Sequence, residues 1–315
     1  MEKPCSEDTH RRRMRISIRR SLRPTEGRPQ QLSDTMLFFS SPFHCLRKSR
    51  LFERLVSSRF NEPRYYDLKF PFPIALRPIT HASIRWRRGR MEGRITSLFK
   101  ALLKTLEKLE NQGSFYDVGA NVGLYSWIAK SLNPTRKVLA FEPDPQNSEL
   151  LERTRTSSDI QGMEVHQVAL SCEKGLADFH QDGYTSATGM LADDQVPWVE
   201  KYLGKKTKIM EVEKRLMDDF PYTEDAPALI KIDVEGHELE VLHGGLACLL
   251  KSKPLLLLES FPPKQDKVVD FLHELGYETL DAETRKPIGP QTNNLFAWHS
   301  EGPLPQASIS KIIQA

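Results

Sequence analysis

The sequence predicts an α/β fold in which a mostly parallel sheet is covered by helices on both faces. From residue 115 onward, short apolar stretches alternate with longer segments whose apolar residues recur every three or four positions. Gly, Pro and Asn residues separate these stretches, as expected at turns. Largely apolar strands that alternate with helices are typical of parallel strands buried on both faces.

The composition favours a protein of a reducing compartment. Hydrophobic residues make up 39% of the 315 residues, yet no apolar run approaches the roughly 18–20 residues that span a bilayer. The N-terminus lacks the apolar stretch of a secretory signal. Four widely spaced cysteines form no Cys-x-x-Cys pair, which argues against disulfides and a zinc site. We therefore expect a cytoplasmic protein without a membrane span.

The positive charge is concentrated near the N-terminus. Residues 1–30 contain nine Lys and Arg and four Asp and Glu, whereas the net charge of the whole chain is +3. Residues 1–35 contain few large apolar side chains, and we expect a disordered basic tail. This tail could be a solvated segment or could contact RNA or an anionic membrane. Because the remaining chain is not basic, we expect no nucleic acid as the main partner.

The elements follow one another in a regular order. Residues 36–112 are expected to form a lead-in that ends in a helix over 98–109. The main domain then covers 113–300, and residues 301–315 are expected to be a C-terminal tail. The predicted strands are 115–118, 137–141, 163–168, 228–232, 255–258, 277–280 and 294–298, and the predicted helices between them are 122–132, 145–156, 237–251 and 265–275.

One long segment, 171–227, interrupts the alternation of strands and helices. It contains a polar, glycine-rich part and a patch around Trp198 and Tyr202. An insertion at this point would lie near the carboxyl ends of the strands, where ligands bind in open α/β sheets. We therefore expect it to form the substrate region.

The turn after the first strand of the main domain has the residues of a ligand site. Asp117 is followed by Gly119 and Gly123, and glycines let the backbone approach a ligand closely. The spacing differs from the Gly-x-Gly-x-x-Gly of dinucleotide binders. A carboxylate at this position would repel a pyrophosphate, but it would favour a cationic ligand. S-adenosylmethionine, with its ammonium and sulfonium, is such a ligand.

An acidic residue also ends the second strand. Glu142 lies 19 residues after Gly123, where a carboxylate can accept hydrogen bonds from both hydroxyls of a ribose. Pro143 fixes the turn that presents this side chain. The strand, turn, helix, strand and acid together predict a nucleoside-binding site.

A second polar cluster, 231–238, follows the apolar fourth strand. Five ionisable groups within eight residues are costly to bury unless they react or pair. Methyl transfer to a hydroxyl requires that the acceptor be aligned and that its proton be removed. Asp233, Glu235 and His237 are therefore the candidate catalytic residues.

Two residues of this cluster have simpler interpretations. Lys231 is expected to pair with a carboxylate, and Glu238 to begin a helix. Asp233 and Glu259 could instead hold Mg²⁺, which prefers carboxylate oxygens. The spacing shows no complete ligand set, so we expect no metal site.

Together these motifs resemble those of the FkbM-type methyltransferase family. The resemblance extends over about residues 90–298 and depends on five blocks, at 117–125, 141–143, 169–171, 231–238 and 294–297. It implies a Rossmann-like class I methyltransferase fold, with a seven-stranded sheet whose last strand is antiparallel. It also implies S-adenosylmethionine-dependent O-methylation of a small-molecule acceptor, a sugar or a polyketide-like natural product.

The resemblance assigns roles to individual residues. Asp117, Gly119, Asn121 and Gly123 would line the methionine end of the cofactor, Glu142 would bind the ribose and Ala169 would lie near the adenine. We count Ala120 and Pro143, which lie within these blocks, among the expected cofactor-binding residues.

Two alternatives remain at this stage. One is a non-catalytic cofactor-binding module that uses its basic tail on RNA or a membrane. The other is an N-methyltransferase, although the sequence lacks an Asn-Pro-Pro-Tyr motif after the fourth strand.

Overall fold

The computed structural model describes residues 47–86, 93–184, 189–192, 196–197, 199–221 and 226–314. The chain divides into two units, Met1–Leu46 and Arg47–Ala315, and the architecture below is that of the second unit. The expected tail at 1–35 and Trp198 lie outside the described residues.

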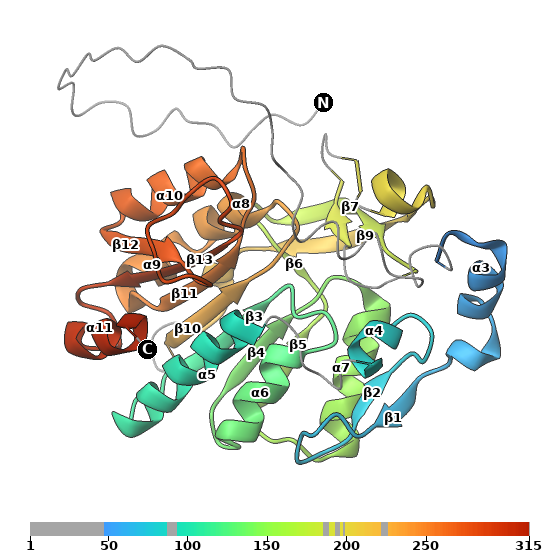
Figure 1. Ribbon diagram of the computed structural model, residues 1–315, viewed down its shortest axis with the longest axis horizontal. Helices are drawn as coiled ribbons and strands as arrows, with labels where there is room; N and C mark the ends of the chain where they lie inside the picture. Colours follow the sequence, from blue (N-terminus) through green and yellow to red (C-terminus); the bar gives the residue numbers. More distant parts are fainter. Residues whose placement is uncertain are drawn as a thin grey trace, which may run out of the picture. The chain divides into compact units, whose positions relative to one another are not determined.

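A seven-stranded sheet forms the centre of this unit, in the order β12-β13-β11-β10-β3-β4-β5 (Figure 1). All of its strands are parallel to one another except β13, which is antiparallel to both neighbours. This topology confirms the predicted class I methyltransferase fold. The strands are β3 (Ser114–Val118), β4 (Val138–Phe141), β5 (Met163–His166), β10 (Pro227–Ile232), β11 (Leu255–Glu259), β12 (Tyr277–Asp281) and β13 (Asn294–His299).

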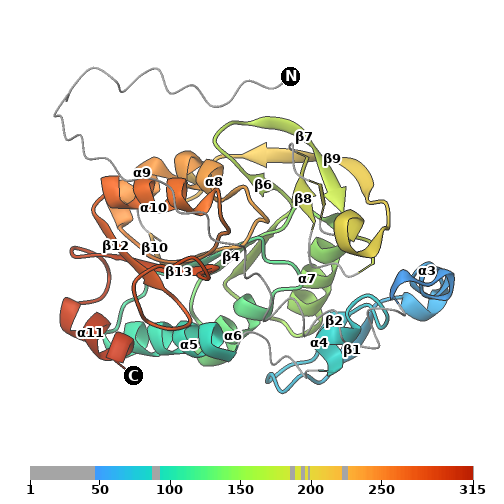
Figure 2. The same cartoon turned by 45° about the horizontal axis from the view of Figure 1, so that its top comes forward.

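Helices cover both faces of the sheet (Figure 2). One face packs against α5 (Gly93–Lys108), α6 (Leu124–Leu132), α7 (Pro145–Ser157) and α11 (Gln306–Gln314). The other packs against α8 (Glu238–Gly244), α9 (Leu246–Ser252) and α10 (Gln265–Glu274). None of the helices in the described ranges is long and apolar enough to cross a membrane.

The predicted single helix over 237–251 is wrong, because two helices, α8 and α9, meet at Gly244 and Gly245. Both glycines lie against other parts of the chain. A Cβ on Gly244 would lie 1.9 Å from the carbonyl oxygen of Ser171, and one on Gly245 would lie 2.7 Å from Sδ of Met217. The break lets the chain pass close to the segment that follows β6 (Ala169–Leu170).

The expected insertion forms a second, four-stranded sheet in the order β6-β9-β7-β8. Its other strands are β7 (Gly175–Gln181), β8 (Met190–Leu191) and β9 (Lys208–Arg215), and it also contains the short helices η3 (Val199–Leu203) and η4 (Met217–Asp219). Because β6 follows β5 closely, this sheet begins at the carboxyl end of the central sheet.

The lead-in is packed against the main domain. It contains α3 (Arg50–Val56), η2 (Arg59–Asn61), β1 (Arg64–Tyr66), β2 (Ile74–Leu76) and α4 (Ala82–Trp86). All of β2 is buried in the same cluster as the central sheet, and the amide of Ala75 donates to Oγ1 of Thr154 in α7 at 2.9 Å. At the other end, the segment expected to be a C-terminal tail contains α11, whose Ile309 is buried.

Candidate active site

A pocket lies at the carboxyl ends of the central strands, with an open volume of about 640 Å³ including its mouth. The loops after β3, β4 and β10 form one side, and residues of the insertion sheet form the other. Eight predicted site residues line it: Gly119, Asn121, Glu142, Pro143, Ala169, Asp233, Glu235 and His237. The fold therefore brings together two clusters that lie about a hundred residues apart in the sequence.

Gly119 allows the β3–α6 loop to lie directly against the loop after β10. Its φ is +74°, and a Cβ there would lie 1.8 Å from the carbonyl oxygen of Asp233. The amide of Asp233 in turn donates to the carbonyl of Val118 at 3.0 Å. The β3–α6 loop and the acidic cluster are thus joined through their backbones.

Asp117, Ala120 and Gly123 do not line the pocket. Asp117 is buried behind the loop, where its Oδ2 accepts hydrogen bonds from the amide and hydroxyl of Ser126 at the start of α6. Burial raises the pKa of Asp117 to about 6. The carboxylate of Asp117 therefore contacts α6 and does not face the pocket. Its charge could act on a ligand only from behind the loop.

Glu142 has the position expected of a ribose-binding acid. Its Oε2 accepts the amide of Asn121 at 2.7 Å and its Oε1 accepts the amide of Asp144 at 2.9 Å. It is only 5% exposed, and burial together with the charge of Asp144 raises its pKa to about 8. The side chain of Asn147 also bonds this carboxylate. A carboxylate has about four acceptor sites, so a site remains for a ligand hydroxyl.

The acidic cluster after β10 is held by two lysines. Nζ of Lys231 lies 2.8 Å from Oδ2 of Asp233 and 4.7 Å from the centre of the Tyr125 ring, which confirms the predicted pairing of Lys231. Nζ of Lys264 donates to the carbonyl of Gly236 at 2.7 Å. Glu238 begins α8 as predicted.

Glu235 is the most strained residue of this cluster. Its φ is +54°, an unfavourable value for a residue with a side chain. Burial and the charges of Asp233, Glu238 and Asp182 raise its pKa. Strain of this kind is common at functional sites, where the surrounding structure enforces it.

His237 is held through Nε2 of its ring, and its Nδ1 faces a carboxylate. Nε2 lies 3.0 Å from Oγ of Ser171, and Nδ1 lies 3.7 Å from Oε2 of Glu240. This geometry fits a positioning role better than that of a free base. Within the described ranges, no group of three or more His, Cys, Asp or Glu residues is arranged to hold a metal ion.

Several residues that line the pocket belong to no motif recognised in the sequence. Asp144 and Asn147 come from the start of α7, where Asp144 is the N-cap and Pro145 the first helical residue, a usable sign of a helix start. Asp182 and the apolar wall come from the insertion, whose strands had no clear periodicity. That apolar wall consists of Phe179, Met190 and Leu191.

Comparison with known proteins gives the class to which this fold and pocket belong. The profile of the methyltransferase FkbM domain matches residues 117–279, just over half of the chain. The chain therefore belongs to the FkbM methyltransferase domain family.

Two curated relatives are similar over parts of their length. Methyltransferase sdnD of Sordaria araneosa is 31% identical over 151 residues, covering 41% of this chain and 58% of that protein. Hexuronic acid methyltransferase AglP of Haloferax volcanii is 29% identical over 142 residues, covering 44% and 52%. This chain spans about half the length of the curated relatives it matches.

A solved structure is also similar. The crystal structure of methyltransferase FkbM from Methylobacillus flagellatus aligns with a TM-score of 0.41 at 20% identity, covering 59% of this chain and 44% of that one.

Proposed function

We propose that this protein is an S-adenosylmethionine-dependent O-methyltransferase whose acceptor is a hydroxyl of a sugar or natural-product-like small molecule. One observation carries the proposal. Glu142, bound to the amide of Asn121, and the acidic pair Asp233 and Glu235 line the same pocket at the carboxyl ends of the strands. Glu142 is suited to bind a nucleoside, and the acidic pair is suited to bind an acceptor hydroxyl.

The residues present fit this cofactor. A buried carboxylate whose oxygens are both held by backbone amides can accept a ribose hydroxyl, and Glu142 has this role in the proposal. Gly119 leaves the loop free of side-chain bulk, and Ala169 provides a small apolar surface for a base. The predominance of carboxylates around the pocket favours a ligand that carries positive charge.

The acidic pair would handle the acceptor. Bound S-adenosylmethionine supplies an activated methyl group. Lys231 keeps one oxygen of Asp233 engaged, so the other can accept the acceptor's O–H and fix its direction. The raised pKa of Glu235 suits it to take up the proton near neutral pH. His237, fixed by Ser171, would position this loop.

Hexuronic acid methyltransferase, one of the relatives, acts on a sugar acid according to its name. This supports a sugar as one acceptor class for the present chain.

Substitution of Asp233 separates binding from transfer. We expect Asp233→Ala to abolish methyl transfer while the Kd for S-adenosylmethionine changes by only about twofold, because Asp233 contacts the acceptor in this proposal. The control is Asp270→Ala, the same change at an exposed position on α10. Unchanged turnover in Asp233→Ala would remove Asp233 from the catalytic residues. Transfer of a labelled methyl group from S-adenosylmethionine to an amine would contradict O-methylation.

A further inference from the structure

Asp182, which no motif had indicated, is a buried carboxylate in the wall of the pocket. It directly follows β7 of the insertion, is 1% exposed and lines the cavity. Its Oδ1 accepts the amide of Tyr184 at 3.0 Å, so the orientation of the carboxylate is fixed. A charged group is costly to bury, which requires that its surroundings or a ligand stabilise it.

Asp182 interacts electrostatically with groups of the lead-in and with carboxyls of the pocket. Arg47 and His81 of the lead-in interact with it, and burial lowers the pKa of His81 to about 4, so His81 is neutral near pH 7. Across the cavity, the negative charge of Asp182 contributes to the raised pKa values of Asp144 and Glu235. Asp182 thus lies within electrostatic range of both the nucleoside side and the acceptor side of the pocket.

Carboxylates dominate the described lining of the pocket. Five line it, Glu142, Asp144, Asp182, Asp233 and Glu235, whereas no Lys or Arg is found among the described lining residues. Lys231, the cation next to the cluster, is already paired with Asp233. An anionic acceptor would be repelled by Asp182 and Asp233, whereas a neutral polyol could donate its hydroxyls to these carboxylates. Glu142 and Glu235 add little to this repulsion near pH 7, because burial raises the pKa of each to about 8.

We propose that Asp182 is an acceptor-binding residue and that, with Glu235, it selects an acceptor that carries no negative charge, such as a neutral polyhydroxylated ring. This inference rests on the proposed methyltransferase function and makes it more specific. Phe179, Met190 and Leu191 provide the apolar surface on which the face of such a ring can pack. In contrast to the uronic acid that gives one relative its name, the expected acceptor lacks a carboxylate.

The test compares paired acceptors with the full-length protein and tritium-labelled S-adenosylmethionine. Each neutral compound is paired with its carboxylate analogue, for example a methyl hexoside with the corresponding uronide and a cyclohexanediol with a hydroxycyclohexane carboxylate. We expect label in the neutral members. Asp182→Asn should lower kcat/KM for them about tenfold, as the loss of a hydrogen bond to a charged group does, and should reduce the preference over the carboxylates.

The matched control is Asp178→Asn, the same change at an exposed position of β7, the strand that Asp182 follows. It should leave transfer unchanged. Three results would overturn the inference. They are methyl transfer mainly to the carboxylate compounds, no transfer to any compound although S-adenosylmethionine binds, and the same kcat/KM for Asp182→Asn and Asp178→Asn. Failure of S-adenosylmethionine to bind instead overturns the proposed function, and this inference with it.

A second measurement does not depend on the acceptor. Carboxyl resonances of ¹³C-labelled protein report the titration of Glu235, with Glu235→Gln used for assignment. Since the charge of Asp182 raises the pKa of Glu235, Asp182→Asn should lower it and Asp178→Asn should not. An unchanged titration in Asp182→Asn contradicts the placement of Asp182 at the acceptor end.

Discussion

At the scale of single residues, the pocket depends on the contact between Gly119 and the backbone of Asp233. The two loops are joined by a hydrogen bond from the amide of Asp233 to the carbonyl of Val118. A side chain at residue 119 would separate them. The cofactor side and the acceptor side are therefore placed relative to each other by one glycine.

Gly119→Ala tests this contact. Because the new Cβ would lie 1.8 Å from a carbonyl oxygen at a positive φ, we expect a loss of about 3 kcal/mol in the free energy of unfolding. Binding of S-adenosylmethionine should weaken in parallel. Gly289→Ala is the control, since its Cβ would meet no atom within 4 Å. Equal unfolding curves of the two variants would contradict this account.

The raised pKa values of buried carboxyls predict a pH dependence. Burial raises the pKa of Asp117 to about 6, of Glu238 to about 7 and of Glu142 to about 8. The pKa values of these carboxyls are higher in the folded state than in the unfolded state. The stability that they contribute is therefore fully present below the pKa of the unfolded state, and it is lost as pH rises through the pKa values of the folded state. The Tm of the ligand-free protein should therefore fall between about pH 5 and 8.

Glu142→Gln provides the comparison for the pH profile. It removes the group with the highest of these values, so its Tm should fall less over the same range. S-adenosylmethionine favours the ionised carboxylate, so its affinity for the natural protein should rise as pH increases toward 8. A Tm that rises with pH in thermal unfolding would contradict the assigned directions.

Site residues could be predicted from the sequence where an ionisable residue directly follows an apolar strand. Glu142 and Asp233 each follow an apolar strand directly, and parallel strands bring such positions to one edge. Asp117 matched the same motif, yet it lies within β3 and its carboxylate bonds Ser126, a contact that the spacing of the motif does not reveal. Asp182 could not be predicted, since its partners lie in the lead-in and at the other side of the pocket.

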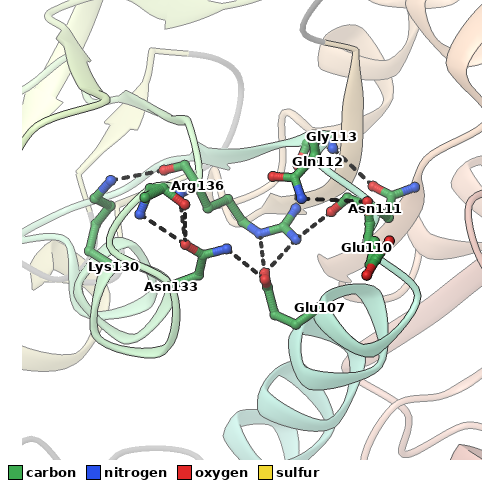
Figure 3. A network of polar contacts seen from close by, with 9 residues as sticks. Glu107, Glu110, Asn111, Gln112, Gly113, Lys130, Asn133 and Arg136 are labelled. Atoms are coloured by element: carbon green, nitrogen blue, oxygen red, sulfur yellow. Dashed lines mark hydrogen bonds and ion pairs between the residues drawn. The ribbon is translucent and has the colours of Figure 1, made fainter.

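At the scale of elements, a buried arginine joins the amino ends of β3 and β4 to α5 (Figure 3). Nε of Arg136 donates to Oε1 of Glu107 at 2.9 Å, and its other nitrogens bond the carbonyls of Asn111 and Gly113. Its side chain is 1% exposed. Asn133 donates to the second oxygen of Glu107 at 2.6 Å, so the pair is fully hydrogen-bonded.

Arg136→Ala should destabilise the fold without altering the site. Removing Arg136 leaves the carbonyls of Asn111 and Gly113 without this donor, whereas Glu107 is 30% exposed and can be solvated. We expect a cost of about 1–3 kcal/mol in chemical denaturation. The affinity for S-adenosylmethionine should persist below the Tm, because this network lies at the end of the strands opposite the pocket. The control Arg153→Ala removes an exposed pair with Glu149 and should change stability by less than about 0.5 kcal/mol. A small effect of Arg136→Ala would show that the network is dispensable.

The elements themselves were predictable where periodicity was strong. The helix predicted over 98–109 corresponds to α5 except for Leu109, which follows the end of α5 at Lys108. The prediction succeeded because the apolar residues of α5 repeat on one face and are buried. The insertion was different, since the residue types of β7 do not follow its burial: Leu176 is exposed whereas Gln181 is buried. The break between α8 and α9 was also hidden, because it reflects contacts with Ser171 and Met217 that are distant in sequence.

At the scale of the whole molecule, charge is divided between the lead-in and the rest. Residues 47–86 contain nine Lys and Arg and three Asp and Glu, so the basic character extends well beyond the N-terminal tail. The lead-in is also structural. Its Ile74 and Leu76 are buried beside Leu150, and Lys205 of the insertion lies 2.6 Å from Glu53 of α3.

Removal of the lead-in should therefore damage the domain. We expect a chain of residues 93–315 to lose cooperative thermal unfolding or to aggregate, because the apolar face that covers α7 is absent. The full chain is the reference in the same calorimetric scan. A truncated chain with an unchanged Tm would show that the lead-in is only an appendage.

Calorimetric titration with S-adenosylmethionine tests the central claim most directly. The full chain should show saturable binding with a Kd in the micromolar range, and Glu142→Ala should weaken it by about tenfold or more because the ribose hydroxyls lose a charged partner. Glu152→Ala on the outer side of α7 should bind as the natural protein does. No heat with S-adenosylmethionine together with saturable binding of NAD would contradict the account.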